Sequence, residues 1–367
     1  SPPDHAAMSR NSDDLVRRRK RTLGAAYSHF YERPLYIVRG EDVWLYDDAG
    51  NKYLDCYNNV PSVRHCHPEV VATLARQPGT LNTHTRYLHH AIIEYAEALA
   101  DTLPGDLSVC SFVCTGTEAN DLAYRIARSV TGNHGAIMTA DAYHGNSTLV
   151  AELSRPYECK RPLPNFVVDT EPPYTYRGPF DEAHPDFAGA YADLVDDAID
   201  RLDGKGHKPA MMIIDSIYDG KCILTPPPEY QQAVYRKVRA AGGLVVADEV
   251  QSGLARLGDN LWGFMDSGVV PDIVTMGKPM GDGHPLAVVV TTPEIATRFA
   301  KETGYFNTFG GNPVSAEVGK KVLEIVLRDK LLDNVRETGS YLKAGLEKLA
   351  ATHELIGEVR GLSLIHI

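Results

Sequence analysis

The sequence has no apolar run that approaches the length of a membrane-spanning helix, and its first residues are polar. Because a span needs about 20 consecutive apolar residues, we expect no membrane segment, and no export signal is visible. Positive charge is also scarce, since the formal net charge is -11. Nucleic acids and anionic membranes carry negative charge themselves, so this balance argues against both as main partners.

Cysteine pairs are missing as well, because the six cysteines are scattered without a CxxC motif. A chain of 367 residues can bury a large core and needs no disulfide staples. We therefore expect free thiols in a reducing cytoplasm. The cysteines are Cys56, Cys66, Cys110, Cys114, Cys159 and Cys222.

Two other kinds of site lack their signatures. The chain contains no G-x-S-x-G motif, so no hydrolase triad can be nominated. His65-Cys66-His67 directs neighbouring side chains to opposite faces of an extended segment. This pattern favours turn or helix-cap roles before Pro68 over a metal site.

From Ser108 onward the chain contains alternating strand and helix patterns. The segments are SVCSFV, EANDLAYRIARSV, GAIMTA, AMMIID, a helix near residues 229–241, LVVADEV and DIVTM. Such alternation is typical of an α/β fold, in which helices cover a mostly parallel sheet. Residues 155–186 are rich in Pro and Tyr and lack periodicity, which indicates a long surface excursion.

The flanking regions predict smaller units at both ends. Residues 13–24 have a helix pattern with acids first and bases last, and residues 35–59 alternate around DDAGN as in a small antiparallel sheet. Helices are also predicted over residues 68–76, 90–103, 313–327 and 331–349, and we expect the last two to leave the main sheet. The resulting units are residues 1–65, 66–312 and 313–367, with the leader SPPDHAA before Met8 set aside.

An acid and an amine follow two of the predicted buried strands. Asp248 ends the apolar run LVVAD, and Lys278 lies just past the strand-like residues 273–276. Carboxyl ends of parallel strands meet at one edge of a sheet, where α/β proteins bind ligands. A lysine and an acid at such an edge suit the imine and the pyridinium nitrogen of pyridoxal phosphate (PLP). A buried ion pair between Asp248 and Lys278 explains the same two residues.

Three further segments carry groups suited to a phosphate or a flat ring. Gly116 and Thr117 follow a strand and open a helix, where N–H groups attract an anion, although a plain helix cap gives the same pattern. Tyr143 either stacks on a flat cofactor or is a loop aromatic, and His144 beside it suits positioning, solvent contact or acid–base work. Thr308, in a glycine-rich turn, is either a phosphate contact or a turn hydroxyl.

The order of five blocks resembles that of the class III aminotransferases, which are PLP enzymes of fold type I. The blocks are GTEAN, DAYHG, ADEVQSGLARLG, TMGKPMGDGHPLA and FNTFGGNP. The similarity runs from about Leu35 to Arg360 and implies a type I α/β fold with a small, here shortened, α+β domain. Within the family, NNVPSVRHCHP and LNTHTRYLH are most similar to the branch that contains ethanolamine-phosphate phospho-lyase.

The resemblance implies a role for each matching residue. Lys278 looks like the catalytic Schiff-base lysine, and Asp248 would pair with the pyridine nitrogen of PLP. Family members are homodimers with shared active sites, so one cofactor would contact residues of both subunits. The expected contacts are Gln251 with the ring hydroxyl, Tyr143 with the ring, Gly116 and Thr117 with the phosphate, Thr308 with the neighbouring subunit's phosphate, and Asn58, Asn59 and Val60 with substrate.

The implied activity is transamination by a ping-pong Schiff-base mechanism. An amino group would move between a primary amine or amino acid and a keto acid or aldehyde. The alternative is elimination of phosphate from O-phosphoethanolamine or a similar phosphorylated amine, which starts from the same residues. A non-catalytic PLP-fold binding protein is a third interpretation, against which the presence of Lys278, Asp248 and Tyr143 argues.

The chain departs from the family pattern at several points. Arg64 and Ala255 stand where the family has glycine, and Asp215-Ser216 replaces a common Glu-Pro or Glu-Ser. The sequence also ends soon after Arg360, whereas relatives continue through most of a small C-terminal domain that often supplies a carboxylate-binding arginine. We therefore expect a truncated or unusually short member, whose more open site favours amines over carboxylates.

Overall fold

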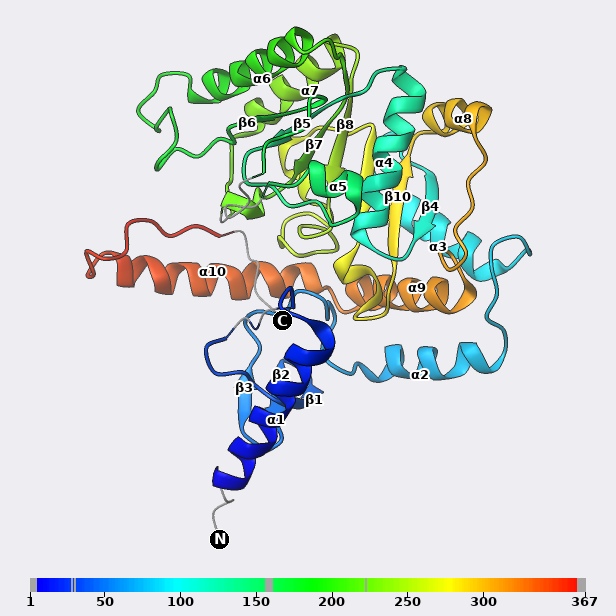
Figure 1. Cartoon of the computed structure of the whole chain (residues 1–367), viewed down its shortest axis with the longest axis vertical. Helices are drawn as coiled ribbons and strands as arrows, with labels where there is room; N and C mark the ends of the chain where they lie inside the picture. The colour runs from blue at the N-terminus through cyan, green and yellow to red at the C-terminus, as the bar shows by residue number, and fades with distance from the viewer. Residues whose placement is uncertain (1–4, 28, 30, 156–160, 222, 362–367) are drawn as a thin grey trace.

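The centre of the computed structural model, which describes residues 5–27, 29, 31–155, 161–221 and 223–361, is a seven-stranded sheet (Figure 1). In spatial order its strands are β4 (Val109–Val113), β10 (Ala287–Thr291), β9 (Ile273–Met276), β8 (Leu244–Asp248), β7 (Pro209–Asp215), β5 (Gly135–Thr139) and β6 (Val167–Thr170). The neighbours from β9 to β6 are parallel, and β10 is antiparallel to both β9 and β4. The predicted mostly parallel α/β sheet is confirmed.

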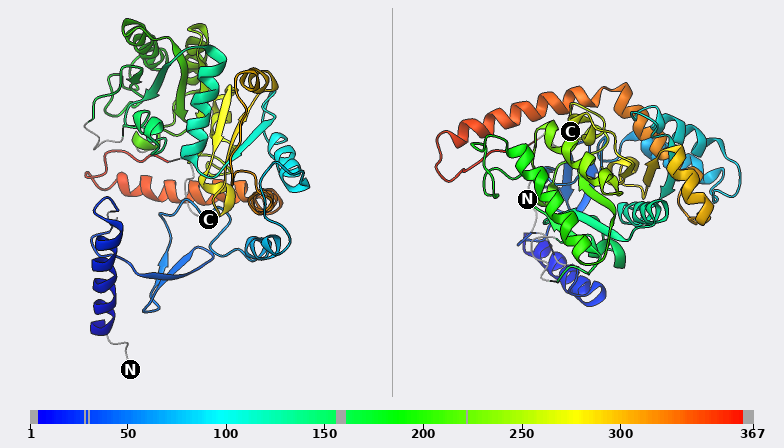
Figure 2. Two further views of the ribbon diagram at one scale, coloured as in Figure 1. Left: turned by 45° about the vertical axis from the view of Figure 1, so that its right-hand side comes forward. Right: turned by 90° about the horizontal axis from the view of Figure 1, so that it is seen from above.

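Helices cover both faces of this sheet (Figure 2). One face packs against α4 (Gly116–Thr131) and α8 (Pro293–Glu302). The other face packs against α6 (Phe187–Gly204) and α7 (Pro228–Ala240) over one half, and against α3 (His90–Ala100) and α9 (Pro313–Arg328) over the other. Because side chains alternate along a strand, Val288 and Val290 of β10 face α3 and α9, whereas Val289 faces α4.

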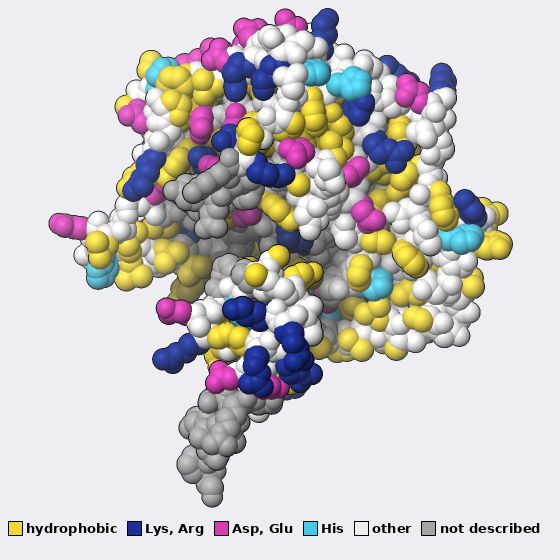
Figure 3. Space-filling model, viewed as in Figure 1, with side chains coloured by type: hydrophobic (Ala, Val, Ile, Leu, Met, Phe, Trp, Pro, Cys, Tyr) yellow, Lys and Arg dark blue, Asp and Glu magenta, His cyan; other side chains and the backbone are white. Residues whose placement is uncertain are grey.

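The N-terminal unit projects from this body (Figure 1). It contains α1 (His5–Leu23) and an antiparallel sheet of β1 (Ile37–Glu41), β2 (Trp44–Asp47) and β3 (Lys52–Leu54). Asp47 closes the predicted DDAGN turn, because its carboxylate accepts hydrogen bonds from the N–H groups of Ala49 and Asn51 at 3.0 and 2.8 Å. Lys and Arg side chains gather on the projection (Figure 3).

Helices α2 (Pro68–Arg76) and α10 (Leu331–Ala350) agree closely with the sequence-based prediction. The prediction did not include α6, α8 or the short α5 (Thr148–Glu152). None of the helices in the described part of the chain combines the length and the hydrophobicity that crossing a bilayer requires. Helix α1 begins earlier than predicted, inside the leader that was set aside, and α3 ends before residue 103.

Two sequence-based predictions about the sheet were wrong. The expected surface excursion over residues 155–186 contains β6, an edge strand whose Val167 and Val168 are buried. Helix α9 does not leave the main sheet, because Val318 and Val322 belong to the same hydrophobic cluster as Val288 of β10. The division at residues 65 and 312 remains a prediction.

Helices α3 and α9 approach each other most closely at a glycine. A Cβ at Gly319 would lie 2.5 Å from Leu286 Cδ2 and 2.5 Å from Tyr95 Cζ, and both of these side chains are buried. By contrast, a Cβ at Gly345 in α10 would meet no atom within 4 Å. The same substitution should therefore have opposite effects in the two helices.

We expect Gly319→Ala to lower the free energy of unfolding by about 1–3 kcal/mol, because overpacking outweighs a helix-propensity gain of about 1 kcal/mol. Gly345→Ala is the control and should raise stability by up to about 1 kcal/mol. Urea unfolding followed by circular dichroism measures both changes. An increase in stability for Gly319→Ala would contradict the close approach of α3 and α9.

Candidate active site

A cavity of about 190 Å³ lies where the central strands end. Its walls come from segments that follow β4, β5, β7, β8 and β9, at the edge where α/β sheets bind ligands. The lining residues are Gly116, Thr117, Tyr143, His144, Gly145, Asp215, Asp219, Asp248, Val250, Gln251 and Lys278. The structure therefore brings together six of the seven predicted cofactor contacts.

Asp248 is held by three hydrogen bonds, two from side chains and one from a backbone N–H group. Its Oδ2 accepts from His144 Nδ1 at 2.7 Å and from Asn120 Nδ2 at 2.9 Å, and its Oδ1 accepts from the N–H of Val250 at 3.0 Å. The residue is only 4% exposed. The network therefore fixes the position and orientation of this carboxylate at the cavity wall.

His144 has one ring nitrogen without a partner. Its Nδ1 must carry the proton, because a carboxylate only accepts hydrogen bonds. Its Nε2 is buried and has no hydrogen-bond partner in the described part of the chain. Of the roles left open by the sequence, this geometry supports positioning, because His144 orients Asp248 and has no solvent contact at its buried ring.

Asn120 and Thr275 belong to the same network, and sequence reasoning gave them no role. Asn120 Nδ2 donates to the carbonyl oxygen of His144 at 2.7 Å as well as to Asp248, while Thr275 Oγ1 donates to Asn120 Oδ1 at 2.7 Å. Two signals were present in the sequence. Asn120 lies four residues after Gly116 on one helix face, and Thr275 is the only hydroxyl in the apolar strand IVTM.

Lys278 begins a short 3₁₀ helix, η4 (Lys278–Gly281), immediately after β9. Its Nζ has no hydrogen-bond or ion-pair partner among the described residues. The interpretation of Lys278 and Asp248 as a buried ion pair was therefore wrong. Asp248 is bonded to His144 instead, which leaves the lysine amine available in the cavity.

Backbone donors face the cavity at the start of α4. Thr115 and Glu118 form a reciprocal capping box, which occupies the N–H groups of Cys114, Thr115 and Glu118. The N–H groups of Gly116 and Thr117 find no acceptor in the described part of the chain. Unpaired N–H groups at a helix N-terminus attract an anion.

Glycine is required where the loops around these donors meet. A Cβ at Gly145, whose φ is +143°, would lie 2.5 Å from Thr117 Oγ1. A Cβ at Gly116 would lie 2.8 Å from Val250 Cγ2. The start of α4 thus packs closely against Gly145 in the loop after β5 and against the Val250 side chain in the loop after β8.

Gln251 is fixed at both ends of its amide. Its Nε2 donates to Asp219 Oδ2 at 3.0 Å, and its Oε1 accepts from Asn59 Nδ2 at 2.5 Å. Because the Asp219 carboxylate only accepts, the NH₂ group must face it, which determines the orientation of the amide. Asp219 was not predicted from the sequence; Asn59 reaches the cavity wall through Gln251.

The other predicted contacts lie outside the cavity. Asn58 and Val60 are half-buried near Asn59 but do not line the cavity of their own chain. Thr308 is exposed and is likewise not part of its wall. Tyr143 lines the cavity and is 56% exposed, so one face of its ring is open.

Glu249 fixes the loop after β8 without lining the cavity. Its buried carboxylate accepts from Ser216 Oγ at 2.5 Å, Ser252 Oγ at 2.8 Å and the N–H groups of Gly263 and Phe264 at 2.7 and 2.8 Å. Burial raises the pKa of Glu249, and these hydrogen bonds oppose the shift. Three of these donors lie within residues 249–264, so the carboxylate holds this segment together, and Ser216 connects it to the loop after β7.

The two positions at which this chain has another residue in place of the family's glycine have positive φ angles. Arg64 has φ +152° and Ala255 has φ +67°, conformations that L-residues rarely adopt. Glycine tolerates both without steric cost, which explains the residue that the family has at these positions. This protein adopts the positive φ angles at both positions although each residue carries a side chain.

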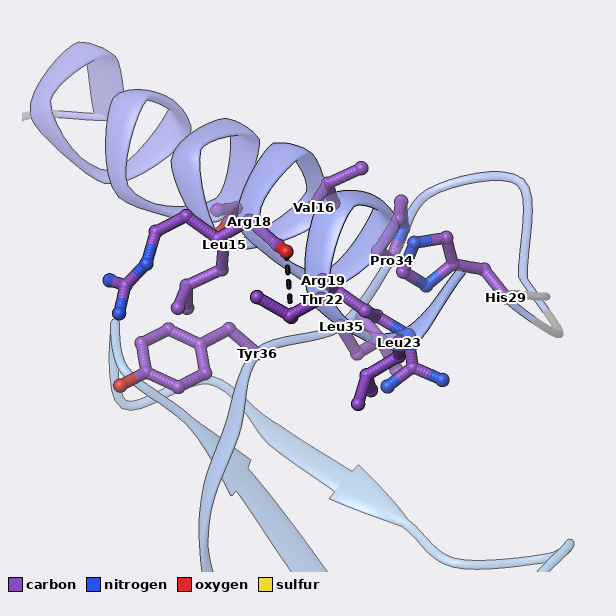
Figure 4. A pocket seen from close by; sticks show the side chains of 11 residues that line it. Leu15, Val16, Arg18, Arg19, Thr22, Leu23, His29, Pro34, Leu35 and Tyr36 are labelled. Atoms are coloured by element: carbon purple, nitrogen blue, oxygen red, sulfur yellow. Dashed lines mark hydrogen bonds between the residues drawn. The ribbon is translucent and has the colours of Figure 1, made fainter. Parts of the chain in front are cut away.

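A second hollow, of about 400 Å³, lies between α1 and the segment around Pro34 (Figure 4). Its walls are mostly the apolar side chains of Leu15, Val16, Leu23 and Leu35, with arginines at the edge. Its lining residues include His29 but no lysine and no carboxylate, so it lacks the pair of an amine and an acid that the first cavity combines.

Four described cysteines, Cys56, Cys66, Cys110 and Cys114, are free as predicted, whereas Cys159 and Cys222 lie outside the described residues.

Asp215 lies next to Asp248 across the paired strands β7 and β8. It is 7% exposed, and its carboxylate accepts from the N–H groups of Ile217 and Asp219 at 3.2 and 2.7 Å. Burial, and then the charge of Asp248, raise the pKa of Asp215 to about 8 from its ordinary value of 3.8. The folded protein therefore holds a proton here that the unfolded chain releases.

This pKa predicts a stability that falls as pH rises. Between about pH 4 and pH 8 the folded state binds the extra proton, so the contribution of Asp215 decreases by up to about 1.4 kcal/mol per pH unit. Asp215→Asn should flatten that slope, while any lost hydrogen bond adds the same offset at every pH. Urea unfolding of both apoproteins between pH 5 and pH 8 measures the difference, and equal slopes would contradict the assignment.

Comparison with known proteins identifies the family. The sequence matches the family model described as aminotransferase class-III over residues 26–366. It is 41% identical to the mitochondrial alanine–glyoxylate aminotransferase 2 homolog 2 of Arabidopsis thaliana, over 100% of this chain and 75% of that protein.

Solved structures agree in fold. A phospholyase from Arthrobacter in complex with phosphoethanolamine is 41% identical, with a TM-score of 0.88 over 92% of this chain and 80% of that one. An (S)-enantioselective omega-transaminase from Thermomicrobium roseum is 29% identical, with a TM-score of 0.85 over 96% and 83%. The chain therefore belongs to the class III aminotransferases, PLP-dependent enzymes of fold type I that move an amino group between an amine and a carbonyl compound.

Proposed function

We propose that PLP binds in the cavity between Lys278 and Asp248 and that transamination takes place there. The observation that carries this proposal is a lysine amine without a partner among the described residues, in the same cavity as a buried carboxylate that bonds to His144 and Asn120 instead of to the lysine. Both groups are what the cofactor needs, an amine for its aldehyde and an anion for its ring nitrogen. His144 and Asn120 hold that anion in place.

The rest of the cavity fits the other parts of PLP. The free N–H groups of Gly116 and Thr117 suit the phosphate, because the α4 N-terminus adds its dipole to them. Tyr143 presents an open ring face for stacking, and Gln251 presents a fixed amide to the ring hydroxyl. Asn58, Asn59 and Val60 would contact the substrate beyond Gln251.

When bound, PLP supplies a protonated ring that accepts electrons from the carbon next to the substrate nitrogen. Lys278 Nζ then acts as general base and removes the proton from that carbon. The lysine is half-buried, and no carboxylate among the described residues bonds to its Nζ, so no ion pair holds the amine away from the substrate. His144 and Asn120 keep the Asp248 carboxylate in place, where it would face the ring nitrogen.

Transamination fits the charges of the cavity better than phosphate elimination does. Asp219 and Asp248 line it together with Asp215, which holds a proton up to about pH 8, and Lys278 is the only Lys or Arg among its lining residues. A phosphorylated amine needs a second cation for its own phosphate, and the described wall supplies none. The similarity to the Arthrobacter phospholyase favours elimination as the second candidate.

Replacing Lys278 by Ala should abolish turnover of 1-phenylethylamine with pyruvate, with a loss of at least about 100-fold, because the general base is gone. Lys301→Ala, an exposed lysine at the end of α8, is the control and should leave the rate unchanged. Acetophenone formation measures the rate. Borohydride reduction of the PLP-loaded enzyme should label the peptide that contains Lys278, and full turnover by Lys278→Ala would refute the proposal.

The same preparations separate the two candidate reactions. Wild-type enzyme given O-phosphoethanolamine should release no phosphate above background. Phosphate release that needs no keto acid would instead establish the phospho-lyase activity.

We also propose a homodimer with shared sites. Thr308 is exposed in a patch of large side chains with Tyr87, Leu88, Phe306 and Phe309, which are 65%, 96%, 41% and 70% exposed. Exposed apolar patches of this kind mark contact surfaces. A second copy docked there would bring Thr308 to the phosphate of the other subunit.

Thr308→Ala should raise the dissociation constant for PLP about tenfold, since a hydroxyl bond to a charged phosphate is lost. Thr303→Ala, a nearby hydroxyl that donates to the carbonyl oxygen of Gly304, is the matched control. Fluorescence titration of the apoproteins measures affinity, and light scattering measures the mass. A monomer that binds PLP tightly would contradict the shared site.

A cytoplasmic location remains a prediction that rests on the unpaired cysteines. The Arabidopsis relative carries a mitochondrial name, so the two compartments are the alternatives. Cell fractionation distinguishes them.

A further inference from the structure

Asp282 joins two parts of the site that are distant in sequence. It follows η4 directly, so it lies four residues after Lys278, and its backbone is left-handed with φ 48° and ψ 45°. Its Oδ1 accepts from the N–H groups of Ser62 at 2.8 Å and Val63 at 3.2 Å, and the N–H of Arg64 also bonds to the carboxylate. Ser62 Oγ completes the contact by donating to the carbonyl oxygen of Pro279 at 2.7 Å.

A carboxylate is well suited to this position. Residues 62–64 form no helix or strand, so their N–H groups have no secondary-structure partners. A carboxylate has several lone pairs and can accept hydrogen bonds from three neighbouring N–H groups. An N–H group left without an acceptor in a half-buried segment would lower the free energy of unfolding. Burial raises the pKa of Asp282, and the three backbone hydrogen bonds oppose that shift.

The segment held by Asp282 continues directly from the proposed substrate contacts. Asp55 connects the two ends of this loop. It accepts a hydrogen bond from the N–H of Asn58 at 2.9 Å and contacts His65 Nε2 at 2.7 Å. Asn59 in turn bonds to Gln251 at the cavity wall. The loop of residues 55–65 is therefore attached to the body at the cavity wall and at the turn that carries the lysine.

We propose that Asp282 is a positioning residue that sets the separation between the Lys278 turn and residues 58–60. An amine that enters the cavity then meets the base and the substrate-contacting loop at a fixed spacing. The inference rests on the proposed roles of Lys278 as base and of Asn58, Asn59 and Val60 as substrate contacts. Asp282 touches neither cofactor nor substrate, and it acts through the backbone of Ser62, Val63 and Arg64.

Two substitutions separate the carboxylate from the backbone conformation. Asp282→Gly removes the acceptor and keeps the positive φ without strain. Asp282→Asn keeps one acceptor oxygen and also tolerates the left-handed region. Asp266→Asn is the control, because Asp266 is another carboxylate whose pKa is raised by burial, bonded to Asn260 away from this loop.

In the apoprotein, Asp282→Gly should speed amide hydrogen exchange of residues 62–64 at least about tenfold, and Asp282→Asn should have a smaller effect. In the PLP-loaded enzyme, the KM for the amine should rise about tenfold with kcat and the PLP dissociation constant within about twofold of wild type. Asp266→Asn should change none of these quantities.

Unchanged exchange at residues 62–64 in Asp282→Gly, or an unchanged KM, would overturn the proposal. An equal loss of PLP affinity and KM would also overturn it, because Asp282 would then support only the lysine turn. If Asp282→Gly does not fold, Asp282→Asn carries the same test. Failure of the proposed function is distinct, since it would appear as full activity in Lys278→Ala.

Discussion

The site depends on a buried carboxylate that is hydrogen-bonded on both oxygens by groups other than the lysine. Asp248 receives hydrogen bonds from Asn120 in α4, from His144 in the loop after β5 and from the backbone of its own loop. If Lys278 were its partner, the strong attraction between two buried charges would hold the amine and the carboxylate together. Neither group would then be available to a cofactor. Strand register keeps them apart, because Asp248 pairs with Thr275 and Lys278 follows three residues later, beyond a glycine that turns the chain.

Close backbone packing brings the anion-binding end of α4 near the lysine. Strands β4 and β9 are separated in the sheet by β10, so their following loops would not meet without small residues. A Cβ at Gly277 would lie 3.4 Å from Gly116 Cα and 3.1 Å from Val250 Cγ1. One valine and two glycines thus set how far the phosphate-binding donors lie from the amine.

The sequence predicted well what local pattern and strand order determine. Buried runs such as AMMIID and LVVADEV indicate parallel strands wherever they lie, and their carboxyl ends must share one edge, so the cavity around Asp248 and Lys278 was predictable. The hydrogen-bond partners were not, because Asn120 and Thr275 meet only after α4 and β9 pack together. Strand β6 was missed because its four residues follow a proline-rich stretch that hides a short edge strand.

The pairing of β4 has a consequence for how the chain folds. In the sheet, β4 is an edge strand, and its one neighbour is β10, which lies more than 150 residues later. Contacts between such distant segments form slowly, since a long loop must close before they stabilise anything. During synthesis β4 therefore stays unpaired until the ribosome has delivered β10, so chaperones would meet an intermediate in which α4 can already pack against β7, β8 and β9 while β4 lacks its partner.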